Sequence, residues 1–99
     1  MVTHIICWKL KEQALGHTKL ENAQELKRRL EALVGVVPGL QEAHVGINFN
    51  EKNDYDVSLY SLLEDREALA VYQDHPAHVK VKEFVHQVIE GRVCVDSEQ

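Results

Sequence analysis

The segment from Val2 to Leu10 constrains the fold most, because it is rich in strand-forming residues and apolar on both faces. In an extended conformation alternate residues share a face. One face carries Val2, His4, Ile6 and Trp8, and the other carries Ile5 and Cys7. A strand without a polar face has to be covered on both sides. The rest of the chain must therefore supply two covers, or a partner must supply one.

An amphipathic helix follows from Thr18. Thr18 and Glu21 have the spacing of a capping box, in which each side chain satisfies the other residue's backbone N–H. Apolar residues then recur at helical spacing on one face: Leu20, Ala23, Leu26, Leu30, Leu33 and Val34. Gly35 and the Pro38-Gly39 pair end the element. The sequence thus predicts one helix that packs on one face of a sheet.

Two alternating strands come next. The segment from Ala43 to Phe49 and the segment from Tyr55 to Leu63 both alternate between two faces. Residues 50–54 are polar and rich in Asn and Asp, which is typical of a hairpin loop. These two segments are predicted to form an antiparallel pair.

The second helical region is interrupted by a proline. Asp65 is a good N-cap, Pro76 cannot continue the first helical piece, and it suits the first turn of a second piece. Gly91 is expected to end that second piece, and Val93 to Val95 forms the last strand. The resulting order is β-α-β-β-α-β.

This order predicts an α+β fold with a four-stranded antiparallel sheet and both helices on one face. A chain of 99 residues is one domain, covering residues 1–99. The helices cover only one face of the sheet, and no element is left for the other. A second copy of the chain is the simplest cover, so the pattern predicts a homodimer.

Charge and composition limit which classes of partner and which cellular compartment are expected. A net charge of −5 repels phosphate backbones, and the only basic cluster is residues 27–29, so we do not expect nucleic-acid binding. No apolar run approaches the roughly 18 residues that a membrane span needs, and no signal peptide is visible, so a cytoplasmic protein is expected. Cys7 and Cys94 lack a redox spacing and are expected to be free, buried thiols.

The segment Tyr72-Gln73-Asp74-His75-Pro76-Ala77-His78 holds the best candidates for proton-transfer chemistry. His78 would be the third helical residue after the break, where the helix dipole disfavours an imidazolium, and its spacing to Val81 and Val85 points it inward. Two interpretations stay open: a buried structural histidine, or a ligand-binding or catalytic one. Tyr72 is either a donor to a substrate oxygen or ordinary core, and His75 fits an N-cap.

A pocket under the sheet could be lined by further polar residues. His4 and Trp8 share a strand face, and His44, Asp56 and Tyr60 are inward candidates on neighbouring strands. The alternative is that these groups pack at a dimer seam. His75 and His78 alone do not make a metal site, so no metal is expected. No nucleophile motif, phosphate loop or dinucleotide fingerprint occurs, so no cofactor is expected.

The chain resembles the stress-responsive A/B barrel domain (Dabb) family of dimeric α/β barrel proteins. The resemblance covers roughly Val2 to Asp96 and depends on the order and spacing of several short segments. These are Val2-Thr3-His4-Ile5-Ile6 with Lys9-Leu10-Lys11, Val37-Pro38-Gly39-Leu40 with Val45-Gly46, Tyr55-Asp56, Glu67-Ala68-Leu69-Ala70-Val71-Tyr72 with His75-Pro76-Ala77-His78, and Val93-Cys94-Val95-Asp96.

The resemblance implies a ferredoxin-like fold and a homodimer whose sheets meet face to face. One plant branch of the family cyclises linear polyketides without a cofactor, and its catalytic tyrosine and histidine match Tyr72 and His78. His4 matches a pocket histidine of that branch, whereas Asp56 stands where the branch has another histidine.

Three hypotheses follow. The protein is an acid–base enzyme acting on a small apolar or aromatic carbonyl compound, in which His78 takes a proton and Tyr72 steadies the oxyanion. Alternatively, it is a binding or stress-associated protein without turnover, or a cofactor-free monooxygenase.

Overall fold

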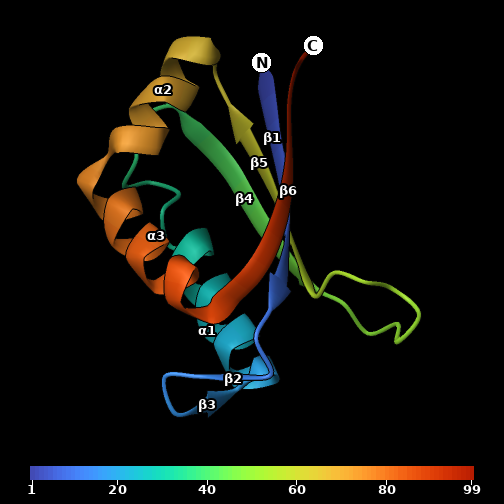
Figure 1. Ribbon diagram of the computed structural model, residues 1–99. Helices are drawn as coiled ribbons and strands as arrows, with labels where there is room; N and C mark the ends of the chain where they lie inside the picture. The colour runs from blue at the N-terminus through green and yellow to red at the C-terminus, as the bar shows by residue number, and fades with distance from the viewer.

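The computed structural model describes residues 1–99 and contains a four-stranded antiparallel sheet covered by helices on one face (Figure 1). The strand order in the sheet is β4-β5-β1-β6. The elements along the chain are β1 (Val2–Leu10), β2 (Gln13–Ala14), β3 (His17–Thr18), α1 (Lys19–Glu31), β4 (Leu40–Ile47), β5 (Val57–Leu63), α2 (Arg66–Asp74), α3 (Pro76–Val88) and β6 (Ile89–Glu98). The predicted α+β, ferredoxin-like architecture is confirmed. None of the helices has both the length and the apolar character that crossing a membrane requires.

The predicted start of α1 is confirmed. The Thr18 hydroxyl accepts a hydrogen bond from the Glu21 backbone N–H at 3.2 Å, and the Glu21 carboxylate accepts one from the Thr18 N–H at 2.9 Å. The predicted apolar stripe is too long, however, because α1 ends at Glu31 and both Leu20 and Val34 are exposed. The small β2–β3 hairpin before α1 was not predicted. Leu15 and Gly16, with φ of 55° and 77°, form its tight turn.

The break between α2 and α3 follows the predicted chemistry. The Asp65 carboxylate caps α2 by accepting a hydrogen bond from the Ala68 N–H at 2.8 Å. His75 caps α3, because its Nδ1 accepts from the Ala77 N–H at 3.1 Å, and Pro76 is the first helical residue.

The prediction that Gly91 ends the last helix is wrong. Helix α3 ends at Val88, and Gly91 lies inside β6, opposite Lys9 of β1. The last strand is also longer than the predicted segment from Val93 to Val95. Pairing with β1 along its whole length supplies hydrogen-bond partners that extended backbone needs, and this tertiary ladder prevails over the local helix signal.

The sheet buries one face and exposes the other. The face under the helices carries most of the core, including Ile6, Leu59 and Leu63. On the outer face a cross-strand row runs His44–Tyr60–Ile5–Val95, and Ile5 and Val95 are 41% and 62% exposed. The single chain therefore covers only one side of β1, as the apolar pattern of that strand predicts.

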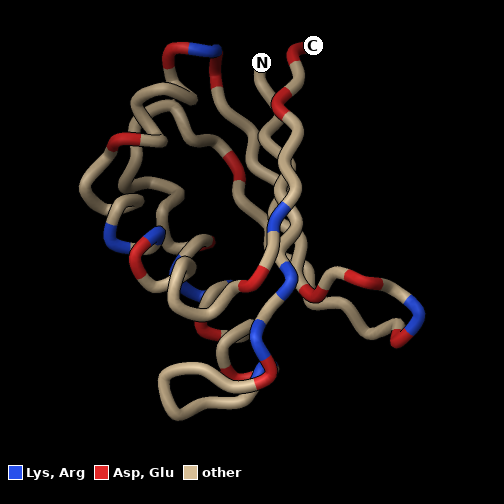
Figure 2. The backbone as a smooth tube through the Cα atoms, viewed as in Figure 1, with Lys and Arg blue, Asp and Glu red and all other residues tan.

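Charged residues are interspersed over the helices and loops. Figure 2 shows acidic and basic residues along the helical side and at the tip of the β4–β5 loop, without one large basic patch. Cys7 and Cys94 are free thiols, as predicted. They lie on opposite faces of the sheet, and the prediction that both are buried is wrong. Cys7 is half-buried, and Cys94 is exposed because β6 is an edge strand.

Candidate active site

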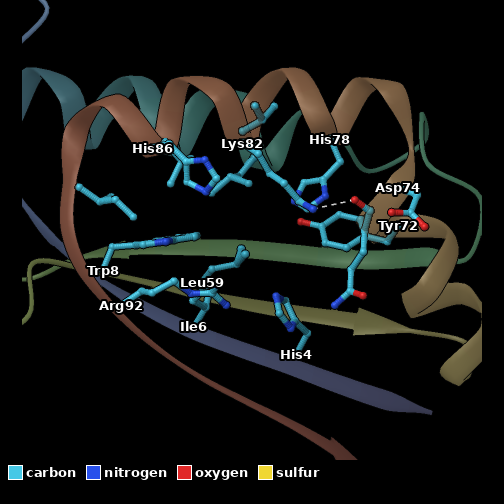
Figure 3. Close-up of a pocket in the computed structure, with 15 residues that line it drawn as sticks. His4, Ile6, Trp8, Leu59, Tyr72, Asp74, His78, Lys82, His86 and Arg92 are labelled. Atoms are coloured by element: carbon cyan, nitrogen blue, oxygen red, sulfur yellow. Dashed lines mark hydrogen bonds between the residues drawn. The ribbon is translucent and has the colours of Figure 1, made fainter.

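A cavity of about 370 Å³ lies between the inner face of the sheet and helices α2 and α3 (Figure 3). Strands β1, β5 and β6 form its floor, and α3 with the end of α2 forms its roof. The lining residues are His4, Ile6, Trp8, Leu30, Leu59, Tyr72, Gln73, Asp74, His78, Val81, Lys82, Val85, His86, Ile89 and Arg92. Eight of these residues are hydrophobic and the others are polar or charged, so apolar and polar side chains share the lining almost equally.

Tyr72 and His78 lie together at one end of this cavity. Their rings stack with centroids 3.9 Å apart and an interplanar angle of 23°. The chain turns at His75 and Pro76, so two side chains six residues apart on different helices meet face to face. Figure 3 shows the Tyr72 hydroxyl pointing into the cavity. The Lys82 ammonium donates to the Gln73 carbonyl at 2.8 Å and ties the two helices together above the pair.

Burial sets the protonation of the pair. It raises the pKa of Tyr72 to about 12, because the phenolate would lose its hydration. It also lowers the pKa of His78 to about 4, with the nearby Lys82 ammonium adding to the effect. At neutral pH the phenol is therefore protonated and the imidazole is neutral. The buried Nδ1 of His78 has no hydrogen-bond partner within the protein.

His4 approaches Tyr72 from the floor of the cavity. Its ring lies edge-on to Tyr72, with centroids 6.1 Å apart. Asp96 pairs directly with His4 across β1 and β6, and its carboxylate is hydrogen-bonded to His4 Nδ1. A carboxylate acceptor at Nδ1 requires a proton on that nitrogen. Trp8, on the same strand face, also lines the cavity as predicted.

The prediction that His44, Asp56 and Tyr60 face inward is wrong. His44 and Tyr60 are cross-strand partners on the outer face, where their rings stack at 6.2 Å. Asp56 precedes β5, and its carboxylate accepts a hydrogen bond from the Leu10 N–H at 2.8 Å. The register between β4, β5 and β1 decides which side of the sheet each side chain faces, and this register was not predicted.

Several lining residues were missed by the sequence analysis. Arg92 pairs with Trp8 across the strands and shares its face, and Asp74, Lys82 and His86 lie along the helical side of the cavity. Strand parity places Arg92 and Asp96 on one face of β6, but only the pairing of β6 with β1 shows that this is the face of His4 and Trp8.

Comparison with known proteins identifies the fold independently of this geometry. The family model described as "Stress responsive A/B Barrel Domain" matches residues 2–99. A dimeric protein of unknown function with a ferredoxin-like fold, from Bacteroides fragilis, is 30% identical with a TM-score of 0.89. The alignment covers 99% of this chain and 95% of that one.

Two more distant structures share the fold and are described as enzymes. A hydroxynitrile lyase from Passiflora edulis has a TM-score of 0.81 at 13% identity, covering 97% of this chain and 90% of that one. A putative antibiotic biosynthesis monooxygenase from Nitrosomonas europaea has a TM-score of 0.78 at 17% identity, covering 100% and 98%. At these identities the likeness shows the fold alone. No curated protein matches the chain.

Proposed function

Since the chain belongs to the stress responsive A/B barrel domain family, we propose that it is a homodimer that binds a small, mostly apolar carbonyl compound in the Tyr72–His78 cavity. Membership of the family does not specify a ligand. The ligand class is inferred from the side chains that line the cavity of this chain.

The observation that carries the proposal is the stacked Tyr72–His78 pair inside an open cavity of about 370 Å³. A purely structural pair would be enclosed by core side chains, with its polar atoms satisfied within the protein. Here His78 Nδ1 lacks a protein partner, and the volume falls within the range of sites for small molecules. The cavity volume therefore favours a bound small molecule.

The chemistry of the lining suggests how such a ligand is held. A carbonyl oxygen would accept a hydrogen bond from the Tyr72 hydroxyl, which stays protonated because burial raises the pKa of Tyr72 to about 12. The apolar body of the ligand would pack against Ile6, Trp8 and Val85. The strength of this contact comes from apolar area removed from water, and the orientation of the ligand comes from the polar groups of the lining.

A second candidate function is cofactor-independent acid–base catalysis at the same site. The observation in its favour is a neutral imidazole stacked on a phenol, next to the position assigned to the carbonyl. His78 would take a proton from the carbon beside the carbonyl, and Tyr72 would stabilise the negative charge that develops on oxygen. The monooxygenase alternative has no comparable observation in its favour.

The dimer is supported by the outer face of the sheet. Tyr60, Ile5 and Val95 form an exposed, largely apolar row there, and the relative from Bacteroides fragilis is dimeric. A second copy placed on this face would bury the side of β1 that the helices leave open.

The ligand proposal can be tested by screening carbonyl metabolites for thermal stabilisation and then measuring affinity by calorimetry. Tyr72→Phe should weaken binding of any hit by about 1–2 kcal/mol, the range for one lost hydrogen bond in a buried site. Tyr60→Phe is the matched control, since it makes the same change on the outer face and should leave affinity unchanged. Equal affinities for the protein and the Tyr72→Phe variant would contradict the proposal. Turnover that disappears in His78→Gln, with binding retained, would favour the enzyme.

A further inference from the structure

Three side chains with metal-binding atoms meet at the edge of the sheet, beside the cavity. They are His4 of β1 and Cys94 and Asp96 of β6. One ligand atom of each, the His4 Nδ1, the Cys94 Sγ and an Asp96 carboxylate oxygen, lies within 4.8 Å of the other two. The group therefore brings a nitrogen, a sulfur and an oxygen donor to one point.

The pairing register of β1 and β6 brings these three side chains together. His4 and Asp96 are direct cross-strand partners, and Cys94 is two residues before Asp96 on the same strand, opposite Ile6. Residues two apart on a strand project from the same face. All three side chains consequently lie on the helix side of the sheet, away from the outer face where a second copy would pack. His4 is 7% exposed, so the anchoring ligand is held in place by the core.

The spacing of the atoms fits zinc. Zinc–nitrogen and zinc–sulfur bonds of about 2.0 and 2.3 Å at a tetrahedral angle separate the two ligand atoms by about 3.5 Å. The Cys94 Sγ lies 3.7 Å from the His4 Nδ1. The Asp96 carboxylate is closer to Nδ1, at hydrogen-bonding contact, and would have to move by about 1 Å to reach the separation of two zinc ligands. Its side chain is 40% exposed on an edge strand, which leaves room for that movement.

We propose that His4, Cys94 and Asp96 bind Zn²⁺, with a fourth position filled by water or by a group of a bound ligand. A thiolate and an imidazole select zinc over magnesium or calcium, which prefer sites made of oxygen atoms. Three protein ligands and one open position are typical of zinc sites that contact other molecules.

Binding changes the protons in a defined way. The Cys94 thiol loses its proton to solvent and becomes the thiolate ligand. The proton of His4 moves from Nδ1, where the metal binds, to Nε2, so that the ring stays neutral. The Asp96 carboxylate exchanges a hydrogen bond from His4 for a bond to the cation. One proton is released per zinc ion bound. His4 also lines the cavity, but zinc binding does not require the proposed carbonyl ligand, and either can exist without the other.

Cobalt is a suitable probe, because a thiolate bound to Co²⁺ gives a near-ultraviolet charge-transfer band. The full chain, reduced and freed of metal, is titrated with Co²⁺ and then with Zn²⁺. The expected result is one saturable site per chain, a charge-transfer band that zinc abolishes, and protection by zinc of one of the two thiols against a thiol reagent.

Matched variants show whether the site is the one proposed. Losing an outer-shell partner of a metal site already weakens binding by about 10–100-fold, so Cys94→Ser should weaken it by about 100-fold or more and remove the band. Cys7→Ser makes the same change on the opposite face and should leave the titration unchanged. Asp96→Asn should weaken binding while retaining the band. Cys94 is exposed, so its replacement should leave the fold intact, which circular dichroism checks.

Three results would overturn the proposal. They are the absence of saturable binding at micromolar metal, binding that Cys94→Ser leaves unchanged, and binding that Cys7→Ser weakens as strongly as Cys94→Ser does. The last two would mean adventitious metal binding only. None of these results bears on the test of the carbonyl ligand, which uses Tyr72→Phe and Tyr60→Phe.

Discussion

His78 shows how a single residue acquires its properties from its surroundings. Its place in the first turn of α3 already predicts a neutral ring, since the dipole there disfavours a cation. The structure adds a larger effect, because burial under α2 and against Tyr72 lowers its pKa to about 4. The imidazole is consequently a weak base that accepts hydrogen bonds over the whole physiological range.

This shift makes stability depend on pH. Above pH 6.5 the ring is neutral in both the folded and the unfolded chain. Between pH 6.5 and 4 the unfolded chain takes up a proton at His78 that the folded chain refuses, so the free energy of unfolding decreases as the pH falls. The total loss is on the order of 3 kcal/mol.

Urea denaturation at several pH values measures this loss. His78→Gln keeps most of the volume but does not titrate, so its stability should fall less steeply over the same window. His86→Gln, which replaces an exposed histidine on the same helix, is the control and should follow the unchanged protein. If the free energy of unfolding falls equally with pH in His78→Gln and in the unchanged protein, the ring is not held neutral by burial.

At the scale of elements, the position of α2 depends on a glycine. Gly39 has a φ of +83°, and a Cβ built on it would lie 2.6 Å from the Ala68 Cβ on α2. The Gly39 carbonyl also accepts a hydrogen bond from the Glu64 N–H at 3.0 Å, which joins the start of β4 to the end of β5. The sequence predicts this glycine only as a helix stop, whereas in the structure it also makes room for the helix that carries Tyr72.

Gly39→Ala should therefore be strongly destabilising. A left-handed conformation without glycine costs about 1–2 kcal/mol, and overpacking against Ala68 adds about 1–3 kcal/mol. Gly35→Ala is a matched control, because Gly35 has a φ of +87° but no atom within 4 Å of a built Cβ. Denaturant melts should separate the two variants by at least about 1 kcal/mol. Equal losses would mean that α2 can shift to accommodate the methyl group.

At the scale of the whole molecule, the chain leaves half of its sheet uncovered. Val95, 62% exposed, lies on the edge strand β6 beside Ile5, on the outer face of the sheet. A domain of this size buries a modest fraction of its surface, so further burial by a second copy adds to a small margin of stability.

Val95→Asp should consequently produce monomers at micromolar concentration, because dimerisation would then place a charge against apolar side chains of the partner. Val71→Asp is the control, since Val71 is an exposed valine on α2, on the opposite side of the sheet, and should not affect assembly. Light scattering coupled to size exclusion distinguishes the two. A monomeric parent protein, or a Val95→Asp variant that remains dimeric, would contradict the proposed interface.

Local patterns in the sequence determined most of the elements. The capping box at Thr18, the cap at Asp65 and the break at Pro76 each depend on hydrogen bonds or ring geometry within a few residues, and the structure shows all three. The order of strands and helices and the placement of Tyr72 and His78 near each other also follow from such local signals.

Tertiary structure alone decided which polar residues share the cavity. A one-residue difference in strand parity moves a side chain to the opposite face of a sheet. The alignment of the strands places His44 and Tyr60 on the outer face of the sheet. It also places Arg92 and Asp96 on the inner face, with His4 and Trp8. The contacts between β1 and β6 join residues about 90 positions apart, such as His4 and Asp96. Short-range sequence patterns do not specify such pairings, because they depend on how whole strands align in the folded sheet.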